Sequence, residues 1–204
     1  MIQSDGNVLF PVFIKLHQVQ TLVVGGGNVG LEKVEALLKN DPNARITVIA
    51  PEIKSELVDL SNQAENIQLI NRKVRGRDLR TADILILATD NYALHVRLKK
   101  KAEKLRLLTN VADTPDLCDF YLGSTVKKGD LKIGISTNGK SPTFAKRFRQ
   151  ILEEVLPENT QELLDQLKSI RDRLKGDFES KVQKLNEITS VLVEKNEDNE
   201  TTVK

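Results

Sequence analysis

The chain has 204 residues, of which 39% are hydrophobic and 29% are charged, a composition typical of a globular protein with one or two domains. Its 31 basic and 29 acidic residues leave a net charge of +2, which gives no indication of a nucleic-acid partner. The single cysteine, Cys118, excludes a disulfide within the chain, and one cysteine with two histidines offers few ligands for a transition metal. The apolar segment 8–14 is short and interrupted by Pro11, so we expect neither a signal peptide nor a membrane span, and a cytoplasmic protein.

The first 113 residues have the alternating pattern of an α/β domain. Five short apolar runs are typical of strands buried on both faces: 21–24, 45–50, 67–70, 84–88 and 107–111. Amphipathic patterns after the first run and at 92–105 predict helices. The order β-α-β-α-β-β-α-β predicts a Rossmann-type, doubly wound parallel sheet, in which ligands bind at the carboxyl ends of the strands.

After Asp113 the pattern changes. Residues 120–126 and 131–136 predict a hairpin around the loop 127–130, and Ser141-Pro142 predicts the start of a helix that Pro157 ends. From residue 161 to Leu192 apolar residues recur every three or four positions, which predicts helix with a break or bend at Gly176. We expect four parts: a Rossmann domain at 1–113, an α+β segment at 114–157, a helical C-terminal region at 158–193 and a polar tail at 194–204.

A GxGxxG motif, formed by Gly25, Gly27 and Gly30, follows the first strand and opens the first helix. In that context the motif predicts dinucleotide binding. Gly25 allows a tight turn, Gly27 lets the backbone approach a pyrophosphate, and Gly30 lets the helix pack closely on the strand. The amides around Asn28 and Val29 would face the phosphates at the helix N-terminus. A structural turn without a ligand is the alternative.

The second strand ends at Ala50-Pro51-Glu52, where an acidic residue usually holds the adenosine ribose. We expect Pro51 and Glu52 to contact the cofactor, and Glu52 to favour NAD because it would repel the 2′-phosphate of NADP. Neighbouring Lys54 weakens that preference, and a solvated loop residue is the alternative for Glu52. Thr89 and Asp90 end another strand at the same edge and are expected in the nicotinamide pocket.

Five segments in the right order resemble the precorrin-2 dehydrogenase family, which includes the N-terminal part of siroheme synthases and the bifunctional dehydrogenase/ferrochelatases. They are 10–16, the GGGNVG turn followed by Lys33, 88–90, 110–115 and 134–142. The resemblance extends from about Leu9 to Pro157. It implies NAD-dependent oxidation of precorrin-2 to sirohydrochlorin in siroheme biosynthesis, insertion of ferrous iron in some members, and a homodimer assembled through the segment 114–157.

The family's key aspartate falls in the motif matched by 110–115, which makes Asp113 the catalytic candidate. Asp113 also follows a predicted strand at its carboxyl end, where such sheets place ligands. Dehydrogenation sends a hydride to nicotinamide and a proton to a base or to solvent, and a desolvated carboxylate is suited to take that proton. The alternative is a turn role beside Pro115.

Precorrin-2 is a polycarboxylate, and the segment before the helix at Pro142 offers groups that would bind it. We expect substrate contacts from four residues at this helix N-terminus: Thr137, Asn138, Lys140 and Ser141. Five more cations in the same stretch would form a basic wall: Lys127, Lys128, Lys146, Arg147 and Arg149. A solvated cationic face is the alternative for each of them.

Three other functions compete with this interpretation. A regulatory NAD-sensing module without chemistry would bind the dinucleotide but not turn over precorrin-2. A short-chain dehydrogenase needs a Tyr-x-x-x-Lys pair, whereas Tyr92 and Tyr121 are followed at that spacing by Val96 and Thr125. Chelation as the main activity would use Asp113 again, as the base for pyrrole protons. The two histidines, His17 and His95, lie outside the matched segments, and we expect surface or packing roles for them.

Overall fold

The computed structural model describes residues 6–174 and 178–189 and divides the chain into two compact units that meet between Gly123 and Ser124. We describe each unit by itself. None of the described helices is both long and apolar enough to cross a membrane.

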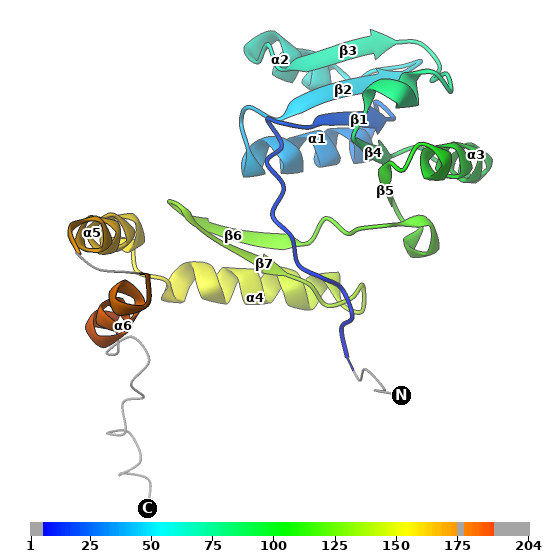
Figure 1. Cartoon of the computed structure of the whole chain (residues 1–204). Coiled ribbons are helices and arrows are strands. Elements are labelled where there is room, and N and C mark those ends of the chain that lie inside the picture. Colours follow the sequence, from blue (N-terminus) through cyan, green and yellow to red (C-terminus); the bar gives the residue numbers. More distant parts are fainter. Residues whose placement is uncertain (1–5, 175–177, 190–204) are drawn as a thin grey trace, which may run out of the picture. The chain divides into compact units, whose positions relative to one another are not determined.

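The first unit is built on one parallel sheet of five strands in the order β3-β2-β1-β4-β5 (Figure 1). The strands are β1 (Gln20–Val24), β2 (Arg45–Ala50), β3 (Ile67–Asn71), β4 (Ile84–Leu87) and β5 (Leu108–Val111). The order reverses at β1, as in a doubly wound sheet, so the predicted Rossmann-type fold is confirmed. Val24 pairs with Ile49 and Leu87, and Leu87 pairs with Val111. The strands β1, β2, β4 and β5 therefore end at one level, at the carboxyl end of the sheet.

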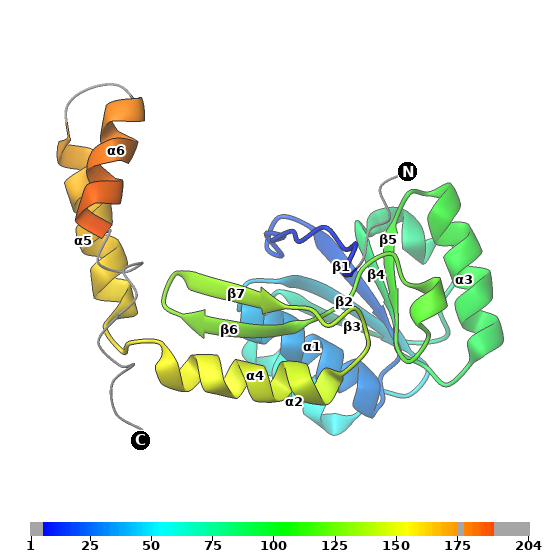
Figure 2. The ribbon, with the colours of Figure 1, turned by 90° about the horizontal axis from the view of Figure 1, so that it is seen from below.

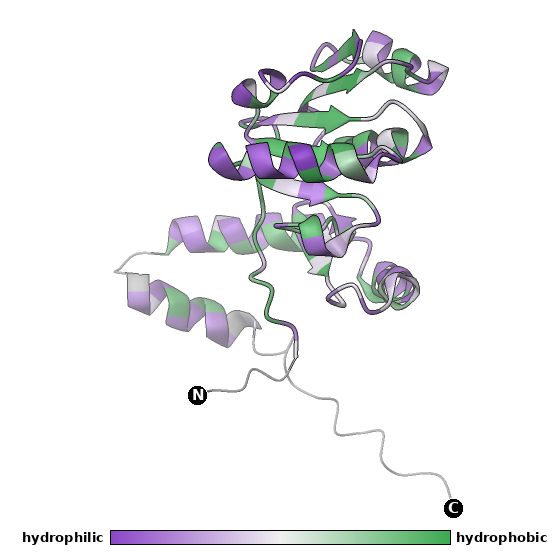
Figure 3. Cartoon of the chain, turned by 90° about the vertical axis from the view of Figure 1, so that its right-hand side faces the viewer, coloured by the Kyte–Doolittle hydropathy of each residue, from purple (hydrophilic) through white to green (hydrophobic). Residues whose placement is uncertain are grey.

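Helices cover both faces of this sheet. α1 (Asn28–Asn40) and α2 (Ser55–Gln63) lie on one face and α3 (Tyr92–Lys104) on the other (Figure 2). Along each strand successive side chains enter alternate cores. Val23 packs with α1 and α2, whereas Leu22 and Val24 pack with α3. Two 3-10 helices complete the unit, η1 (Asp78–Thr81) and η2 (Pro115–Leu117). Figure 3 shows the strands mainly in the hydrophobic colour between helices of mixed colour, as expected for a sheet buried on both faces.

The segment after η2 turns back along the outer edge of β5. The amide of Asp119 donates to the carbonyl of Thr109 (2.8 Å), and the amide of Thr109 donates to the Asp119 carboxylate (2.9 Å). The amide of Val111 donates to Sγ of Cys118 (3.2 Å), and the thiol donates to the carbonyl of Val111 (3.3 Å). These bonds give backbone groups of the edge strand β5 hydrogen-bond partners, although no sixth strand lies beside it. They also explain why the first unit ends at Gly123 and not at the expected boundary, Asp113.

The second unit begins with an antiparallel hairpin of β6 (Ser124–Lys128) and β7 (Leu131–Ile135), against which α4 (Pro142–Val155) packs. The hairpin was expected with a longer loop and an earlier first strand. Gly129, at φ +59, lets the chain turn in two residues, so the strands extend toward the turn. The Ser141 hydroxyl accepts from the amide of Phe144 (3.1 Å), and Pro142 is the first helical residue, which confirms the predicted cap.

Two further helices follow, α5 (Thr160–Arg173) and α6 (Phe178–Thr189), within the range from residue 161 to Leu192 for which helix was predicted. The predicted break at Gly176, the last apolar position at Leu192 and the tail 194–204 lie outside the described residues. Four apolar side chains of α4 are exposed: Phe144 (59%), Phe148 (40%), Ile151 (53%) and Val155 (73%).

Candidate functional site

The glycine turn between β1 and α1 is shaped by two close backbone contacts. Gly25 has φ +127, and a Cβ there would lie 2.1 Å from the carbonyl oxygen of Ala88. A Cβ on Gly30 would lie 2.1 Å from the carbonyl oxygen of Gly25. Both positions therefore require glycine, the first for a tight turn beside β4 and the second for close packing of α1 on that turn.

Gly27 differs from these two glycines, because its backbone borders open space. A Cβ on Gly27 would meet no described atom within 4 Å, and its φ of −87° is available to any residue. Gly27 is the N-cap of α1, and among the described side chains none caps that helix end. The first amides of α1 thus face a space where an anion can approach, which is the geometry that a pyrophosphate requires.

A cavity of about 540 Å³ opens beside this turn, a size typical of ligand sites. It is lined by the ends of β1 and β2, the segment after β3, and the connection from β4 into α3. The cavity brings together three of the predicted cofactor residues, Gly25, Pro51 and Thr89. It is also lined by two cations that were not among the expected site residues, Lys73 and Arg97. Arg97 lies four residues after Ala93 on α3, which also lines the cavity, and no motif in the sequence marks either residue.

The remaining predicted cofactor residues lie around this cavity without lining it. Asn28 and Val29 form the first turn of α1, and the Asn28 side-chain oxygen accepts from Nζ of Lys54 at 2.8 Å. Lys54 also binds Glu56 (2.8 Å), which lowers the pKa of that carboxyl to about 2. Glu52 is exposed, and it is Pro51 beside it that lines the cavity. The ammonium group of Lys54 therefore lies at the start of α1. Lys54 is two residues from Glu52, whose carboxylate was expected to select NAD.

The connection from β4 to α3 is held by a short chain of hydrogen bonds. The Asn91 side chain caps α3 by accepting from the amide of Leu94 (2.9 Å), and the Asn91 amide donates to Oγ1 of Thr89 (3.3 Å). Nε2 of His95 lies 2.8 Å from the same oxygen. His95 is 3% exposed, and burial lowers its pKa against the opposing influence of Asp90, which is itself exposed.

Asp113 lies two residues beyond the end of β5. It is at the carboxyl end of the sheet, where the glycine turn also lies. The amide of Ala112 donates to the carbonyl of Leu87 (2.9 Å), which continues the pairing with β4 to the residue before Asp113. Asp113 has φ +55, a left-handed conformation that is uncommon outside glycine and that recurs at functional sites. Its side chain is exposed, so the chain alone does not supply the desolvation expected for this carboxylate.

The segment that carries Asp113 is tied to α3 through an ion pair. Nζ of Lys99 lies 2.6 Å and 2.7 Å from the two carboxylate oxygens of Asp119, and Lys99 is 8% exposed. The same carboxylate accepts from the amide of Thr109 on β5. Asp119 therefore joins α3, β5 and the segment that follows Asp113.

The predicted substrate residues lie together in the loop before α4, in the second unit. Ser141 accepts from Phe144 through its hydroxyl, and its own amide donates to Oγ1 of Thr137 (3.2 Å). Asn138 has φ +52, and Lys140 is exposed. Of the predicted basic wall, Lys128 pairs with Glu158, and Arg149 pairs with Glu153 (2.5 Å). The other members are exposed: Lys127, Lys146 and Arg147.

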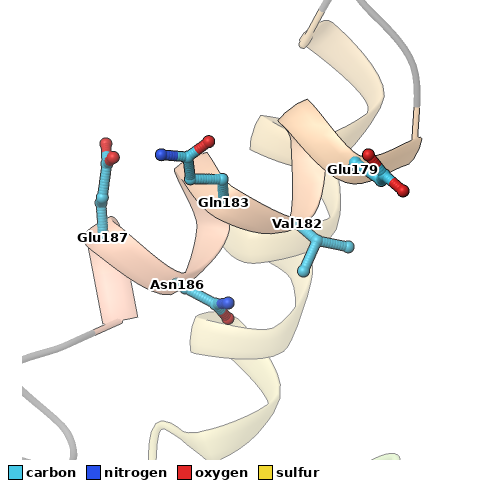
Figure 4. A pocket seen from close by; sticks show the side chains of 5 residues that line it. All are labelled: Glu179, Val182, Gln183, Asn186 and Glu187. Atoms are coloured by element: carbon cyan, nitrogen blue, oxygen red, sulfur yellow. The ribbon is translucent and has the colours of Figure 1, made fainter.

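A second hollow, of about 580 Å³, lies on α6 and is lined by five residues: Glu179, Val182, Gln183, Asn186 and Glu187 (Figure 4). All five belong to one helix and point away from it, so nothing converges on a ligand. No group of three acidic, histidine or cysteine residues in the described part of the chain could hold a metal ion. Burial raises the pKa of the Cys118 thiol, which agrees with a packing role.

Two family models match the chain. The family described as putative NAD(P)-binding matches residues 12–124, and the one described as sirohaem biosynthesis protein central matches residues 128–154. The first match ends one residue beyond the division between the two units, and the second match lies within the second unit.

Relatives and solved structures point the same way. The siroheme synthase of Nitrosospira multiformis is 34% identical over 177 residues, which are 85% of this chain and 37% of the relative. The siroheme synthase of Psychrobacter arcticus is 34% identical over 176 residues, 86% of this chain and 31% of the relative. The chain thus spans about a third of the length of these curated relatives. SirC, a precorrin-2 dehydrogenase, has a similar structure, with a TM-score of 0.70 and 26% identity over 88% of this chain and 89% of that chain.

These similarities confirm the resemblance to the precorrin-2 dehydrogenase family that five segments of the sequence indicated. The match over residues 12–124 covers more than half of the chain, and the protein belongs to the putative NAD(P)-binding family.

Proposed function

We propose that this chain is a NAD-dependent dehydrogenase that oxidises precorrin-2 to sirohydrochlorin in siroheme biosynthesis. The observation that carries the proposal is the meeting of the glycine turn and Asp113 at one edge of the sheet, in a fold similar to that of SirC over most of its length. A dinucleotide and an acid–base group are the two requirements of the reaction, and both belong at this edge.

The glycine turn fits the phosphates of the cofactor. Amides of Asn28 and Val29 would hold the pyrophosphate in the open space beside Gly27. Pro51 and Thr89 line the cavity that would take up more of the dinucleotide, and Glu52 and Asp90 would lie at its rim. When bound, NAD supplies the hydride acceptor. We propose NAD in preference to NADP on the charge of Glu52, which Lys54 partly offsets.

Asp113 is the proposed catalytic base. Removing a hydride from precorrin-2 leaves a proton to be lost, and a carboxylate at the strand end can accept it. The substrate would itself exclude water from this exposed side chain when it binds. Thr137, Asn138, Lys140 and Ser141 remain the proposed ligands for the substrate's carboxylates, supported by their place before the N-terminus of α4.

We further propose that the protein works in the cytoplasm as a homodimer. Its cysteine is free, which suits a reducing compartment. The exposed apolar face of α4, formed by Phe144, Phe148, Ile151 and Val155, is the surface that a second copy would cover. Ferrous iron is proposed as a second substrate, which enters sirohydrochlorin while Asp113 takes up pyrrole protons.

The deciding experiment supplies enzymatically made precorrin-2 and NAD to the purified chain and records the absorbance change. Conversion to sirohydrochlorin with formation of NADH supports the proposal. Binding of NAD without turnover would instead identify a NAD-sensing module. Adding ferrous iron to the product then tests chelation separately, because metal insertion changes the spectrum again without consuming NAD.

A further inference from the structure

His95 is a buried titratable side chain that the proposed function does not use. It lies on α3, is 3% exposed and is not one of the residues that line the cavity. Its Nε2 nevertheless lies 2.8 Å from Oγ1 of Thr89, which does line the cavity. The contact therefore connects the interior of the first unit with the cavity wall.

The hydrogen-bonding capacity of Thr89 makes this contact consequential. A hydroxyl has one proton to donate and two lone pairs to accept with. One lone pair accepts a hydrogen bond from the amide of Asn91 (3.3 Å). If Nε2–H of His95 donates to the second lone pair, the hydroxyl proton is left for a ligand; if Nε2 accepts that proton, a lone pair is left. The tautomer of His95 thus determines whether Thr89 offers a donor or an acceptor to the cavity.

We propose that His95 is a positioning residue for the dinucleotide: it donates from Nε2 to Thr89, so that the Thr89 hydroxyl donates into the cavity to an oxygen of the bound cofactor. This inference rests on the proposed dinucleotide binding. A dinucleotide is rich in acceptor oxygens, on its phosphates and riboses, and a wall group that donates is complementary to them. Burial lowers the pKa of His95, so the ring is neutral near pH 7 and keeps one nitrogen without a proton.

A purely structural role for His95 predicts different behaviour. In that case the imidazole fills space between α3 and the sheet, and its removal lowers the free energy of unfolding without a specific effect on the cofactor. The test therefore measures the dissociation constant for NAD and the thermal midpoint of each variant separately.

The variants form a double-mutant cycle on the full chain. His95→Leu and Thr89→Val should each raise the Kd for NAD about five- to tenfold, the effect of one lost neutral hydrogen bond. The double variant should bind no more weakly than Thr89→Val alone, because both changes remove the same contact. His95→Gln, whose amide can donate from a similar position, should restore most of the affinity. Additive effects, or an unchanged Kd in His95→Leu, would overturn the proposal.

The chain offers a matched control and a measurement on the unchanged protein. His17 is the only other histidine in the sequence; it is exposed and bound to Asp41 (2.7 Å). His17→Leu should leave the Kd for NAD unchanged. In nitrogen-15 NMR of the wild type, adding NAD should shift the His95 ring signals and leave those of His17 in place, with Nε2 of His95 protonated in the complex. An unprotonated Nε2 would contradict the inference. If the wild type does not bind NAD at all, both the proposed function and this inference fail.

Discussion

Lys99, a buried lysine, forms an ion pair with Asp119, with Nζ 2.6 Å and 2.7 Å from the two carboxylate oxygens. The pair joins the middle of α3 to the segment that follows Asp113. Because Asp119 also accepts from the amide of Thr109, three parts of the first unit meet at one carboxylate. Removing the lysine would leave that carboxylate without its partner while the backbone contact remains.

The first prediction concerns this pair. Lys99→Met should lower the free energy of unfolding by about 2 kcal/mol, since the lysine is buried and Asp119 is partly exposed, which places the pair between a fully buried and a surface ion pair. Urea denaturation measures this change in the free energy of unfolding. Lys99→Arg should lose less stability, because arginine keeps the positive charge. Lys100→Met is the control, since Lys100 is exposed and should change stability by less than about 0.5 kcal/mol. Equal stability of Lys99→Met and Lys100→Met would show that the Lys99–Asp119 pair does not stabilise the fold.

Asp113 is the second test. Asp113→Asn keeps the shape but not the basicity of the side chain, and should reduce kcat for precorrin-2 about 10²–10⁴-fold with the Kd for NAD unchanged. Asp113→Gly should lose activity as well and gain up to about 1 kcal/mol of stability, because φ +55 costs glycine nothing. Asp116→Asn, an exposed change in the same segment, is the control. Near-normal turnover in Asp113→Asn would mean that the proton leaves by another route.

Two glycines of the turn, Gly27 and Gly30, should respond differently to alanine. Gly27→Ala places a Cβ in open space, so the protein should fold normally but bind NAD at least about tenfold more weakly, because that space is where a pyrophosphate would lie. Gly30→Ala places a Cβ 2.1 Å from a carbonyl oxygen and should cost about 1–3 kcal/mol of stability. Calorimetric titration and denaturation distinguish the two effects. Unchanged affinity in Gly27→Ala would show that phosphate binds elsewhere.

Cofactor choice provides a fourth prediction. Turnover with NAD should exceed turnover with NADP at equal concentration, and Glu52→Gln should narrow the difference because it removes the charge that repels the 2′-phosphate. Lys54→Met should widen it, since Lys54 is the nearest cation along the chain to Glu52. A preference for NADP in the wild type would assign the dominant influence to Lys73 and Arg97, the two cations of the cavity.

The fifth prediction concerns assembly. Light scattering should give about twice the chain mass of 22.9 kDa. Phe148→Glu, which places a charge in the exposed apolar face of α4, should shift the mass toward that of one chain at micromolar concentration. Gln150→Glu on the same helix is the control, since residue 150 is already polar and exposed. A wild-type monomer with full activity would end the dimer proposal.

Local patterns predicted the fold well. Alternating apolar runs, the glycine turn and the Ser141-Pro142 cap depend on neighbours in the sequence, and each appears where it was expected. The boundary of the first unit could not be predicted in this way. It depends on Cys118 and Asp119 taking the place of a sixth strand, and side-chain bonds to an edge strand leave no periodicity in the sequence.

The site was predicted only in part, for a similar reason. Gly25, Pro51 and Thr89 follow strands, so their meeting at one edge is a consequence of topology. Arg97 lines the cavity from the side of a helix, and His95 contacts Thr89 without lining the cavity. An amphipathic pattern does not separate a buried histidine that packs from one that holds a neighbour. The place of Lys73 depends on the exact path of the segment after β3, and no motif in the sequence indicates that path.

The thiol of Cys118 completes the pairing of β5 and is half-buried, and burial raises its pKa. While the edge is closed, this sulfur is a poor nucleophile and is partly shielded from reagents. Its rate of alkylation should therefore rise when the segment beyond β5 separates from the sheet. As the sole cysteine in the chain, Cys118 is a built-in reporter: one mass shift records the opening of the strand edge beside Asp113, without any engineered label.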